Sequence, residues 1–335
     1  MSILDLNNIF NPVASRLDAV EEEIRRLLQS DIPVISKLSE HVSRGSGKRL
    51  RPALVLLASK FCGYSSDMDI RLAAIVELIH TATLIHDDII DHALLRRGIP
   101  SFNAKWGSTL SVLFGDFLSL CSIRSAIEGR NWRVMEIIAD VATKMIEGEL
   151  IQNEYVYNLK ITRKAYLEVI ERKTAYLFAA CAEIGAVLAD KDERVCEGLS
   201  KFGMELGRAF QFVDDLLDYI STNEKMGKPV FSDLREGKLT LPIISLMEKI
   251  PATVTPIIEN IWSNDFTGND PSVSDEKYIN ILLKLMKQYG TLEETRNLAV
   301  AASNKATNSL PLDEGDTDMR KLLMEIPSIL IDRTH

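Results

Sequence analysis

Glycine and proline are scarce in this sequence. The 335 residues include 17 glycines and 11 prolines, below the average of about 12% for the two together. The chain is 46% apolar and 26% charged, as expected for a globular protein with a sizeable core. This composition excludes collagen-like and low-complexity chains and argues against intrinsic disorder.

Cysteine and positive charge are also in short supply. The four cysteines form no CxxC pair, which fits reduced thiols in a cytosol better than a disulfide framework or a zinc site. The net charge of −9 repels nucleic acid, so we expect no nucleic-acid partner. An anionic ligand must therefore be held by local basic residues or by metal ions.

Long hydrophobic runs are missing as well. The longest apolar stretch, residues 72–85, is interrupted by Glu77 and His80 and is shorter than the ~18–20 residues that a membrane span needs. The first residues lack the basic region and apolar core of a signal peptide. We therefore expect no transmembrane segment and a cytoplasmic location.

Most of the chain has the spacing of apolar residues that is typical of helices, without the alternation of strands. Helices are predicted over residues 20–28, 52–61, 67–90, 109–128, 132–158, 162–189, 192–220, 239–249, 275–288 and 291–307. The polar stretch 263–276 is predicted to be a long exposed loop. No linker divides the chain, so we expect one all-α domain over residues 1–335.

An aspartate motif of the form DDxxD occurs twice, from Asp87 to Asp91 and from Asp214 to Asp218. The first and last aspartates are four residues apart, so on a helix they share a face. Both copies lie in very apolar windows, where ionised carboxylates need cations or hydrogen-bond donors. Such carboxylates suit Mg²⁺, which also takes water and substrate phosphate oxygens. The alternative is a solvated helix face, and the repetition of the motif argues against it.

Basic residues lie close to both motifs. Arg96 and Arg97 follow the first motif, and Lys228 and Lys238 follow the second. Another basic segment, RGSGKRLRP at residues 44–52, precedes a predicted helix. It is not a P-loop, because its glycines are too close together and Arg follows its Lys. By itself such a segment is more often a basic lead-in to a helix. Together with the other basic groups it indicates one site for a polyphosphate.

Three polar residues in apolar helices are further candidates. His80 lies two turns before Asp87 on the same face, which leaves a ligand contact and a core role equally open. Lys173 needs an anionic partner or access to solvent. Gln211 lies one turn before Asp215 and can face the same cavity.

In combination these motifs resemble those of the trans-type (head-to-tail) polyprenyl diphosphate synthases. The resemblance rests on, in order, GKRLRP, IHTATLIHDDIIDHALLRRGIPS, Gly115-Asp116, EGELIQ, RKTAYLF, FQFVDDLLDY and GKPVFSDLREGKLTLP. It implies an isoprenoid-synthase helical bundle around a deep central cavity, usually in a homodimer. It also implies a Mg²⁺-dependent prenyltransferase that condenses isopentenyl diphosphate with an allylic diphosphate, such as farnesyl or geranylgeranyl diphosphate.

The resemblance also assigns roles to individual residues. It implies that Mg²⁺, with three ions per site when substrate is bound, is held by Asp87, Asp91 and Asp214. Supporting carboxylates are Asp88, Asp215 and Asp218. Residues that match the isopentenyl diphosphate site are Lys48, Arg51, His80 and Arg97. Residues that match the allylic diphosphate site are Arg96, Lys173, Lys228 and Lys238. Residues that face the allylic carbon are Thr174 and Gln211.

Product length is predicted from the helix that precedes the first motif. Short-chain relatives carry aromatic residues where this chain has Ala82 and Thr83, and the next turn offers Ile79. Ala82 lies about 7.5 Å below the metal site, so a small residue there favours a long-chain product of about C30–C40, suited to a quinone side chain. The alternative is that another wall of the cavity, formed by Phe114, Met135 or a facing subunit, limits the length of the product.

Other functions compete with this prediction. They are a shorter-chain synthase, a terpene cyclase on the same architecture and a non-catalytic subunit that binds prenyl diphosphates. A cyclase has no need of a second diphosphate site, which Lys48, Arg51 and Arg97 indicate. A silent subunit is disfavoured because none of the matched charged positions is missing.

Overall fold

The structure is a computed structural model that describes residues 8–44, 49–96, 99–220, 230–266, 271–311 and 313–332. These ranges are almost entirely helical, apart from a short hairpin of β1 (Leu95–Arg96) and β2 (Ile99–Pro100). In chain order the helical elements are η1 (Asn11–Val13), α2 (Ala14–Leu27), α3 (Pro33–Arg44), α4 (Leu50–Phe61), α5 (Met68–Ile90), α6 (Phe102–Trp106), α7 (Ser108–Glu128), α8 (Trp132–Glu154), α9 (Arg163–Ile170), η2 (Glu171–Ala175), α10 (Tyr176–Leu188), α11 (Glu193–Ile220), α13 (Ser232–Arg235), α14 (Leu241–Lys249), α15 (Pro251–Phe266), α16 (Pro271–Tyr289), α17 (Thr291–Ser309) and α18 (Thr317–Asp332).

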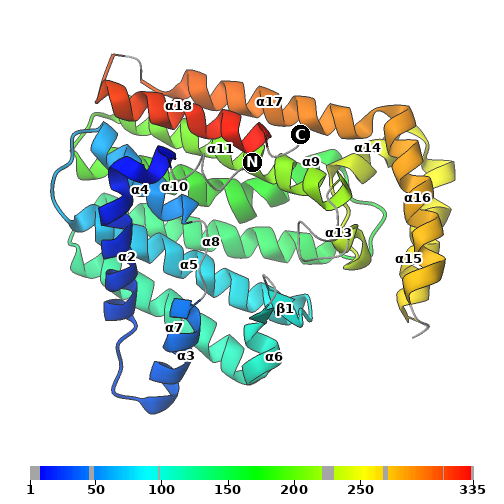
Figure 1. The fold of residues 1–335 in the computed structure, drawn as a ribbon, viewed down its shortest axis with the longest axis horizontal. Coiled ribbons are helices and arrows are strands. Elements are labelled where there is room, and N and C mark those ends of the chain that lie inside the picture. Colours follow the sequence, from blue (N-terminus) through cyan, green and yellow to red (C-terminus); the bar gives the residue numbers. More distant parts are fainter. Residues whose placement is uncertain are drawn as a thin grey trace.

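Helix α5 lies at the centre of the molecule, and most of its apolar residues are buried. It packs against α2, α4 and α7. Figure 1 shows α5, α7 and α8 running side by side, with α2 crossing one end. The first aspartate motif lies at the C-terminal end of α5, where Asp91 is the residue that caps the helix.

Helix α11 is the second organising element and carries the other aspartate motif near its C-terminal end. It packs against α10 on one side and α17 on another. Its buried residues belong to both hydrophobic clusters of the molecule, one around α4, α5 and α10 and the other around α14 to α17. A Cβ on Gly203 of α11 would lie 2.3 Å from the Phe178 carbonyl oxygen, so α10 and α11 pack backbone to backbone.

A π-helical turn, η2, interrupts the helix predicted over residues 162–189 and carries Lys173 and Thr174. Two glycines let neighbouring helices reach this turn. A Cβ on Gly148 of α8 would lie 2.8 Å from the backbone nitrogen of Lys173, and one on Gly207 of α11 would lie 2.5 Å from the Ala175 Cα. Turns of this kind are frequent at functional sites, and here the close packing holds the turn from two sides.

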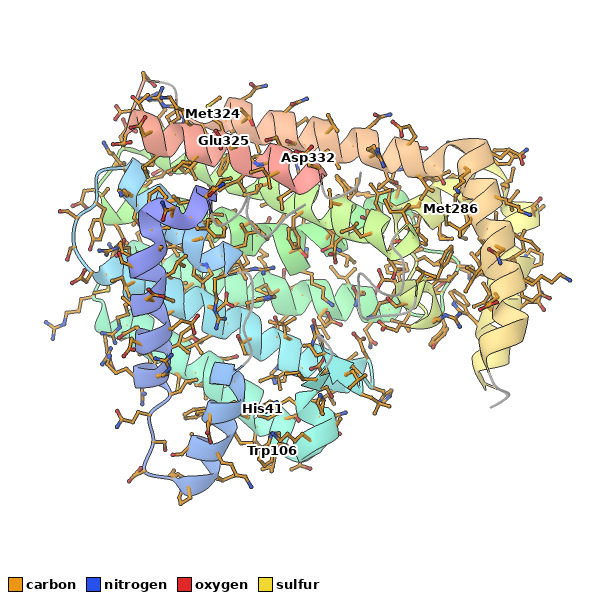
Figure 2. All side chains as sticks on the ribbon, viewed as in Figure 1. His41, Trp106, Met286, Met324, Glu325 and Asp332 are labelled. Atoms are coloured by element: carbon orange, nitrogen blue, oxygen red, sulfur yellow. The ribbon has the colours of Figure 1, made fainter. Side chains whose placement is uncertain are left out.

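The smaller elements are attached by specific contacts. The imidazole of His41 on α3 meets the indole of Trp106 on α6 edge to face, with ring centroids 6.4 Å apart (Figure 2). Lys37 and Lys105 both place their ammonium groups over the Trp106 ring. At the other end of the molecule, α15 and α16 pack against each other and against α14 (Figure 1).

The predicted all-α fold is confirmed, and most predicted helices lie where the spacing placed them. The predicted loop over residues 263–276 is wrong where the chain is described, because α15 runs to Phe266 and α16 begins at Pro271. The helices that the spacing does not predict are α3, α6, α13, α15 and α18. Two of these contain an internal proline, Pro256 in α15 and Pro327 in α18, and an internal proline on its own predicts a break.

Candidate active site

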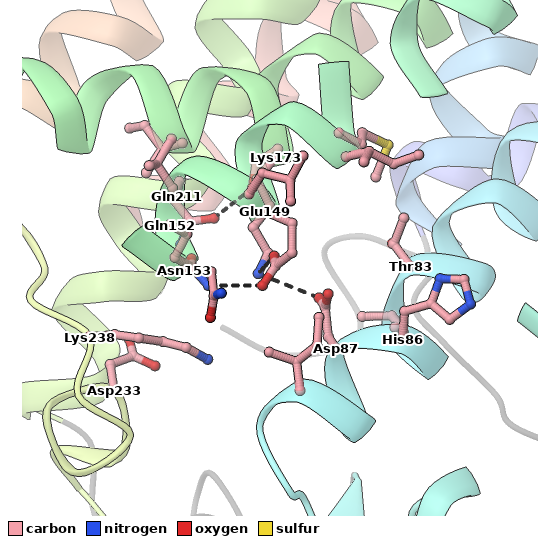
Figure 3. A pocket seen from close by; sticks show the side chains of 18 of the residues that line it. Thr83, His86, Asp87, Glu149, Gln152, Asn153, Lys173, Gln211, Asp233 and Lys238 are labelled. Atoms are coloured by element: carbon pink, nitrogen blue, oxygen red, sulfur yellow. Dashed lines mark hydrogen bonds and ion pairs between the residues drawn. The ribbon is translucent and has the colours of Figure 1, made fainter. Parts of the chain in front are cut away.

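A cavity of about 700 Å³ lies between α5, α7, α8, α9, η2, α11 and residues 233–240. Carboxylates and lysines from separate parts of the sequence meet on its walls: Asp87, Glu149, Lys173, Asp214 and Lys238. Figure 3 shows Asp87, Glu149 and Lys173 facing one another, with Lys238 on the opposite side. Apolar side chains from α5, α8 and α9 complete the lining: Leu84, Met145, Ile146, Leu150, Val169 and Ile170.

Asp87 is buried among charged groups of both signs. Its Oδ2 is 3.5 Å from Nζ of Lys173, which also contacts the Glu149 carboxylate. Burial raises the pKa of Asp87 to about 6; Lys173 opposes this shift, whereas Glu149 and Asp91 add to it. Asp87 is therefore ionised at neutral pH only at a cost in free energy, which additional positive charge in the cavity would reduce.

Lys173 finds the anionic partners that its apolar helix requires. Burial by itself lowers the pKa of Lys173, but the carboxylates of Asp87 and Glu149 outweigh it and the net shift is upward. The ammonium group therefore stays charged inside the cavity. Because its partners are carboxylates within the same site, an incoming polyanion would compete with them for this lysine.

The segment after α11 brings a second lysine to the first motif. Nζ of Lys238 is 2.7 Å from Oδ1 of Asp91 and 2.9 Å from Oε2 of Glu236. Asp218, the last residue of the second motif, holds this segment in place by accepting from the backbone N–H of Ser232 at 3.0 Å and from its hydroxyl at 2.8 Å. Asp218 therefore anchors the chain that carries Lys238.

A smaller cavity of about 250 Å³ adjoins the first, and His80 lines both. Arg96 lines the smaller cavity and donates from Nε to Oδ1 of Asp88 at 2.6 Å. Arg51 lines the larger one, with its guanidinium carbon 4.9 Å from the centroid of the Phe178 ring. Each cavity thus has an arginine on its wall, and His80 lies where the two cavities meet.

A row of hydrogen bonds lies along another wall. The Thr174 hydroxyl donates to Oε1 of Gln211 at 2.8 Å, and Nε2 of Gln211 donates to Oδ1 of Asp215 at 2.9 Å. Oδ2 of Asp215 accepts from the Tyr166 hydroxyl at 2.5 Å. Burial raises the pKa of Asp215 to about 7, although both hydrogen bonds favour the ionised form.

Comparison with known proteins agrees with this arrangement. The family model for polyprenyl synthetase matches residues 32–275. The chain belongs to the polyprenyl synthetase family. It is 34% identical over 330 residues to octaprenyl diphosphate synthase of Escherichia coli, covering 98% of this chain and 99% of that one. It is 32% identical to heptaprenyl diphosphate synthase component 2 of Geobacillus stearothermophilus, covering 96% and 98%.

Solved structures of this polyprenyl synthetase family have the same fold. A Caulobacter crescentus polyprenyl synthase, solved with calcium and isoprenyl diphosphate, has a TM-score of 0.89 and 34% identity, with 98% of each chain covered. A decaprenyl diphosphate synthase from Rhodobacter capsulatus has a TM-score of 0.89 and 35% identity, covering 98% of this chain and 99% of that one. The resemblance inferred from the motifs is confirmed.

The structure brings most of the predicted site residues of this polyprenyl synthetase to one place. Residues that line the larger cavity are Arg51, His80, Thr83, Asp87, Lys173, Thr174, Gln211, Asp214 and Lys238. Asp91 does not line this cavity itself, but it forms an ion pair with Lys238, which does. Arg96 does not line it and is bound to Asp88 at the smaller cavity. Three predicted residues, Lys48, Arg97 and Lys228, lie outside the described residues.

Two of the three residues predicted to control chain length face elsewhere. Thr83 lines the larger cavity, but Ala82 and Ile79 are 1% and 5% exposed and belong to the hydrophobic core. The expectation that Ala82 forms the cavity wall is therefore corrected. The reason is the helical step of about 100° per residue, which turns Ala82 toward the packed side of α5 when Thr83 faces the cavity.

Several residues of the site were missed from the sequence. Glu149 lies within EGELIQ, one of the segments on which the family resemblance rests, but the resemblance assigned Glu149 no role. Tyr166 had no local signal, because its partner Asp215 is 49 residues away. Asp233 also lines the cavity, and burial together with Asp218 and Asp215 raises its pKa well above the ordinary value.

The donor set fits a hard divalent cation that is shared with substrate. Asp87, Asp91 and Asp214 offer carboxylate oxygens, the ligand type that Mg²⁺ prefers. Within the described ranges, no three acidic, histidine or cysteine side chains gather closely enough to hold a metal ion by themselves. This suits Mg²⁺, which takes one or two protein carboxylates and completes its shell with water and phosphate oxygens.

Proposed function

We propose that this chain is a Mg²⁺-dependent trans-polyprenyl diphosphate synthase that adds isopentenyl diphosphate head-to-tail to an allylic diphosphate, farnesyl or geranylgeranyl diphosphate. The observation that carries the proposal is one cavity that combines both aspartate motifs, two lysines and a continuous apolar wall. The relatives named octaprenyl, heptaprenyl and decaprenyl diphosphate synthase support a long-chain product. The use that we propose for this product is a quinone side chain.

Breaking the allylic C–O bond puts negative charge on the departing diphosphate. Asp87, Asp91 and Asp214 would hold Mg²⁺, three ions with substrate bound, and the metal would neutralise that charge. Lys173 and Lys238 are positioned to share the task, because their carboxylate partners at 3.5 and 2.7 Å hold them on two sides of the cavity. Preorganised positive charge of this kind is usually the largest contribution to catalysis.

The allylic cation needs a surface that stabilises it without trapping it. Thr174 and Gln211 present oxygen and amide groups at one wall. The apolar side chains behind them, such as Val169 and Ile170, exclude water that would quench the cation. The same apolar surface would receive the growing hydrocarbon chain.

Isopentenyl diphosphate is the nucleophile and must lie over the cation. Arg51 and His80, which both line the larger cavity, would bind its diphosphate. Holding the alkene next to the allylic carbon supplies a large share of the rate enhancement by proximity. The new C–C bond leaves a tertiary cation, which loses a proton to the departed diphosphate, and the product is a longer allylic diphosphate.

A second copy of the chain is the proposed partner. An apolar face on α7 and α8 is exposed at Val112, Leu113, Leu120, Ile123, Ile127, Trp132, Ile146 and Leu150. Exposed apolar patches of this extent mark association surfaces. Ile146 and Leu150 also line the larger cavity, so a partner on this face would close the cavity wall. A distinct partner subunit is the second candidate, favoured by relatives named component 2.

A cytoplasmic location is part of the proposal. One helix in the described part of the chain, α7, is long and apolar enough to cross a membrane. It packs along α5, however, and its inward residues, such as Phe114 and Leu118, are buried. The exposed side of α7 is accounted for by the proposed association surface.

The deciding experiment incubates the purified protein with radiolabelled isopentenyl diphosphate, farnesyl diphosphate and Mg²⁺, with and without EDTA. A metal-dependent polyprenyl product longer than C20 supports the proposal. Products of C15–C20 identify a shorter-chain synthase, and a cyclic hydrocarbon identifies a cyclase. Substrate binding without turnover identifies a non-catalytic subunit. Light scattering of the same sample separates a homodimer from a monomer that awaits another subunit.

A further inference from the structure

Four side chains form a hydrogen-bonded row that begins in the protein interior and ends at the cavity wall. Tyr166 of α9 is 3% exposed, Asp215 of α11 is 1% exposed, and Thr174 of η2 is 8% exposed. Gln211 lies between Asp215 and Thr174. All four line the larger cavity, which the proposed function uses for the allylic cation.

The buried carboxylate determines which atom of each neighbour faces which way. In the structure each oxygen of Asp215 accepts one hydrogen bond, from Tyr166 and from Gln211. The NH₂ group of Gln211 must therefore point to Asp215, and its carbonyl oxygen must point to Thr174. A carbonyl oxygen cannot donate, so the Thr174 hydroxyl has to give its proton to Gln211.

The consequence lies at the end of the row. A hydroxyl group has one proton and two lone pairs. Because the proton of Thr174 is committed to Gln211, its lone pairs remain for the cavity. An oxygen lone pair attracts a developing carbocation, whereas an O–H pointing at the cation would repel it. The row thus selects the favourable orientation of a group that would otherwise rotate freely.

We propose that Tyr166 and Asp215 are positioning residues that fix the Thr174 hydroxyl as an acceptor toward the reacting allylic carbon. This inference rests on the proposed function, because it needs an allylic cation at the cavity wall. Tyr166 acts through Asp215 by donating to its second oxygen, which holds the carboxyl group in the orientation that meets Gln211. The π turn contributes by placing Thr174 where α8 and α11 enclose it.

The first test is Tyr166→Phe, with Tyr219→Phe as the matched control. Tyr219 is also a buried tyrosine, 2% exposed, and its hydroxyl bonds to Thr240 outside the row. Both variants lose one buried hydrogen bond and keep the ring. We expect Tyr166→Phe to lower kcat about 10- to 100-fold with KM unchanged for both substrates, because the lost interaction acts on the transition state. Tyr219→Phe should stay within about threefold of wild type.

The second readout separates the cation from the ground state. One probe is an ammonium analogue of the allylic cation, given with inorganic diphosphate and Mg²⁺. The other is an unreactive farnesyl thiolodiphosphate, in which sulfur replaces the bridging oxygen. Tyr166→Phe should weaken the ammonium probe by about tenfold or more and leave the thiolodiphosphate unchanged. Equal weakening of both probes overturns the proposal, since a merely structural role would affect them alike.

A double-mutant cycle tests whether Tyr166 acts through Thr174. Thr174→Val removes the hydroxyl and keeps the shape. If the row transmits the effect, Tyr166→Phe should lower kcat by less than about twofold in the Thr174→Val background. Multiplicative losses in the double variant overturn the proposal.

Asp215→Asn keeps the test decisive if Tyr166→Phe does not fold, as judged by circular dichroism. An asparagine side chain can donate toward Gln211, which lets the amide flip and turn the Thr174 proton to the cavity. We expect the same selective loss of the ammonium probe in Asp215→Asn. Unchanged binding of that probe would show that the hydrogen-bonded row does not orient the Thr174 hydroxyl, and would overturn the proposal. Failure of the wild-type enzyme to elongate farnesyl diphosphate refutes the proposed function instead.

Discussion

Asp87→Asn should make the metal-free protein more stable while abolishing its activity. The Asp87 side chain is 14% exposed, and its pKa is raised to about 6 from an ordinary 3.8. At 1.36 kcal/mol per pKa unit, this shift costs the folded state up to about 3 kcal/mol when the carboxylate is ionised. Asparagine has nearly the same volume and no charge, so it removes the cost and leaves Lys173 paired with Glu149.

The sign of the pH dependence follows from linkage. Between pH 3.8 and about 6, the folded state holds the Asp87 proton more tightly than the unfolded state, so stability falls as pH rises through this window. The gain from Asp87→Asn should therefore be complete at pH 8 and vanish near pH 4. At about 2.1 cal/mol/K per residue, 3 kcal/mol corresponds to a rise in Tm of about 4 °C.

The assay is thermal unfolding in EDTA at pH 8 and pH 4.5, with Asp18→Asn on the exposed side of α2 as the control. Turnover with Mg²⁺ should fall by several orders of magnitude in Asp87→Asn and remain normal in the control. A lower Tm for Asp87→Asn at pH 8 would contradict the electrostatic argument. Near-normal turnover of the folded variant would remove Asp87 from the metal site.

Three further outcomes are expected. In steady-state kinetics, Arg51→Ala should raise KM for isopentenyl diphosphate about tenfold or more and leave KM for the allylic substrate unchanged. A rise in KM for the allylic substrate instead would reverse the assignment of the two diphosphate sites. Thr83→Phe places a ring on the cavity wall and should shorten the product to about C15–C20, as measured by chromatography of the product chains. Ala82→Phe should instead lower the stability of the fold by about 1–3 kcal/mol, because it overpacks the core. A shortened product from Ala82→Phe at unchanged Tm would contradict its placement. Leu120→Glu on the exposed side of α7 should convert a dimer into monomers in light scattering, because an unpaired charge cannot be buried there; a dimer that persists would move the interface elsewhere.

Local patterns in the sequence were sufficient for much of this protein. Apolar residues at helical spacing predicted most of the helices, because that periodicity is a property of each segment alone. The DDxxD spacing placed Asp87 with Asp91, and Asp214 with Asp218, on common helix faces for the same reason. The order of the motifs was enough to indicate the family, which the comparison confirmed.

Contacts between distant segments were decided by the tertiary structure. Nothing in the sequence paired Lys173 with Glu149, Lys238 with Asp91, or Tyr166 with Asp215, since each pair joins different helices or loops. The orientation of Ala82 away from the cavity likewise depends on which side of α5 meets its neighbours. Helical periodicity tells which residues share a face, but the packing of whole helices determines what each face meets.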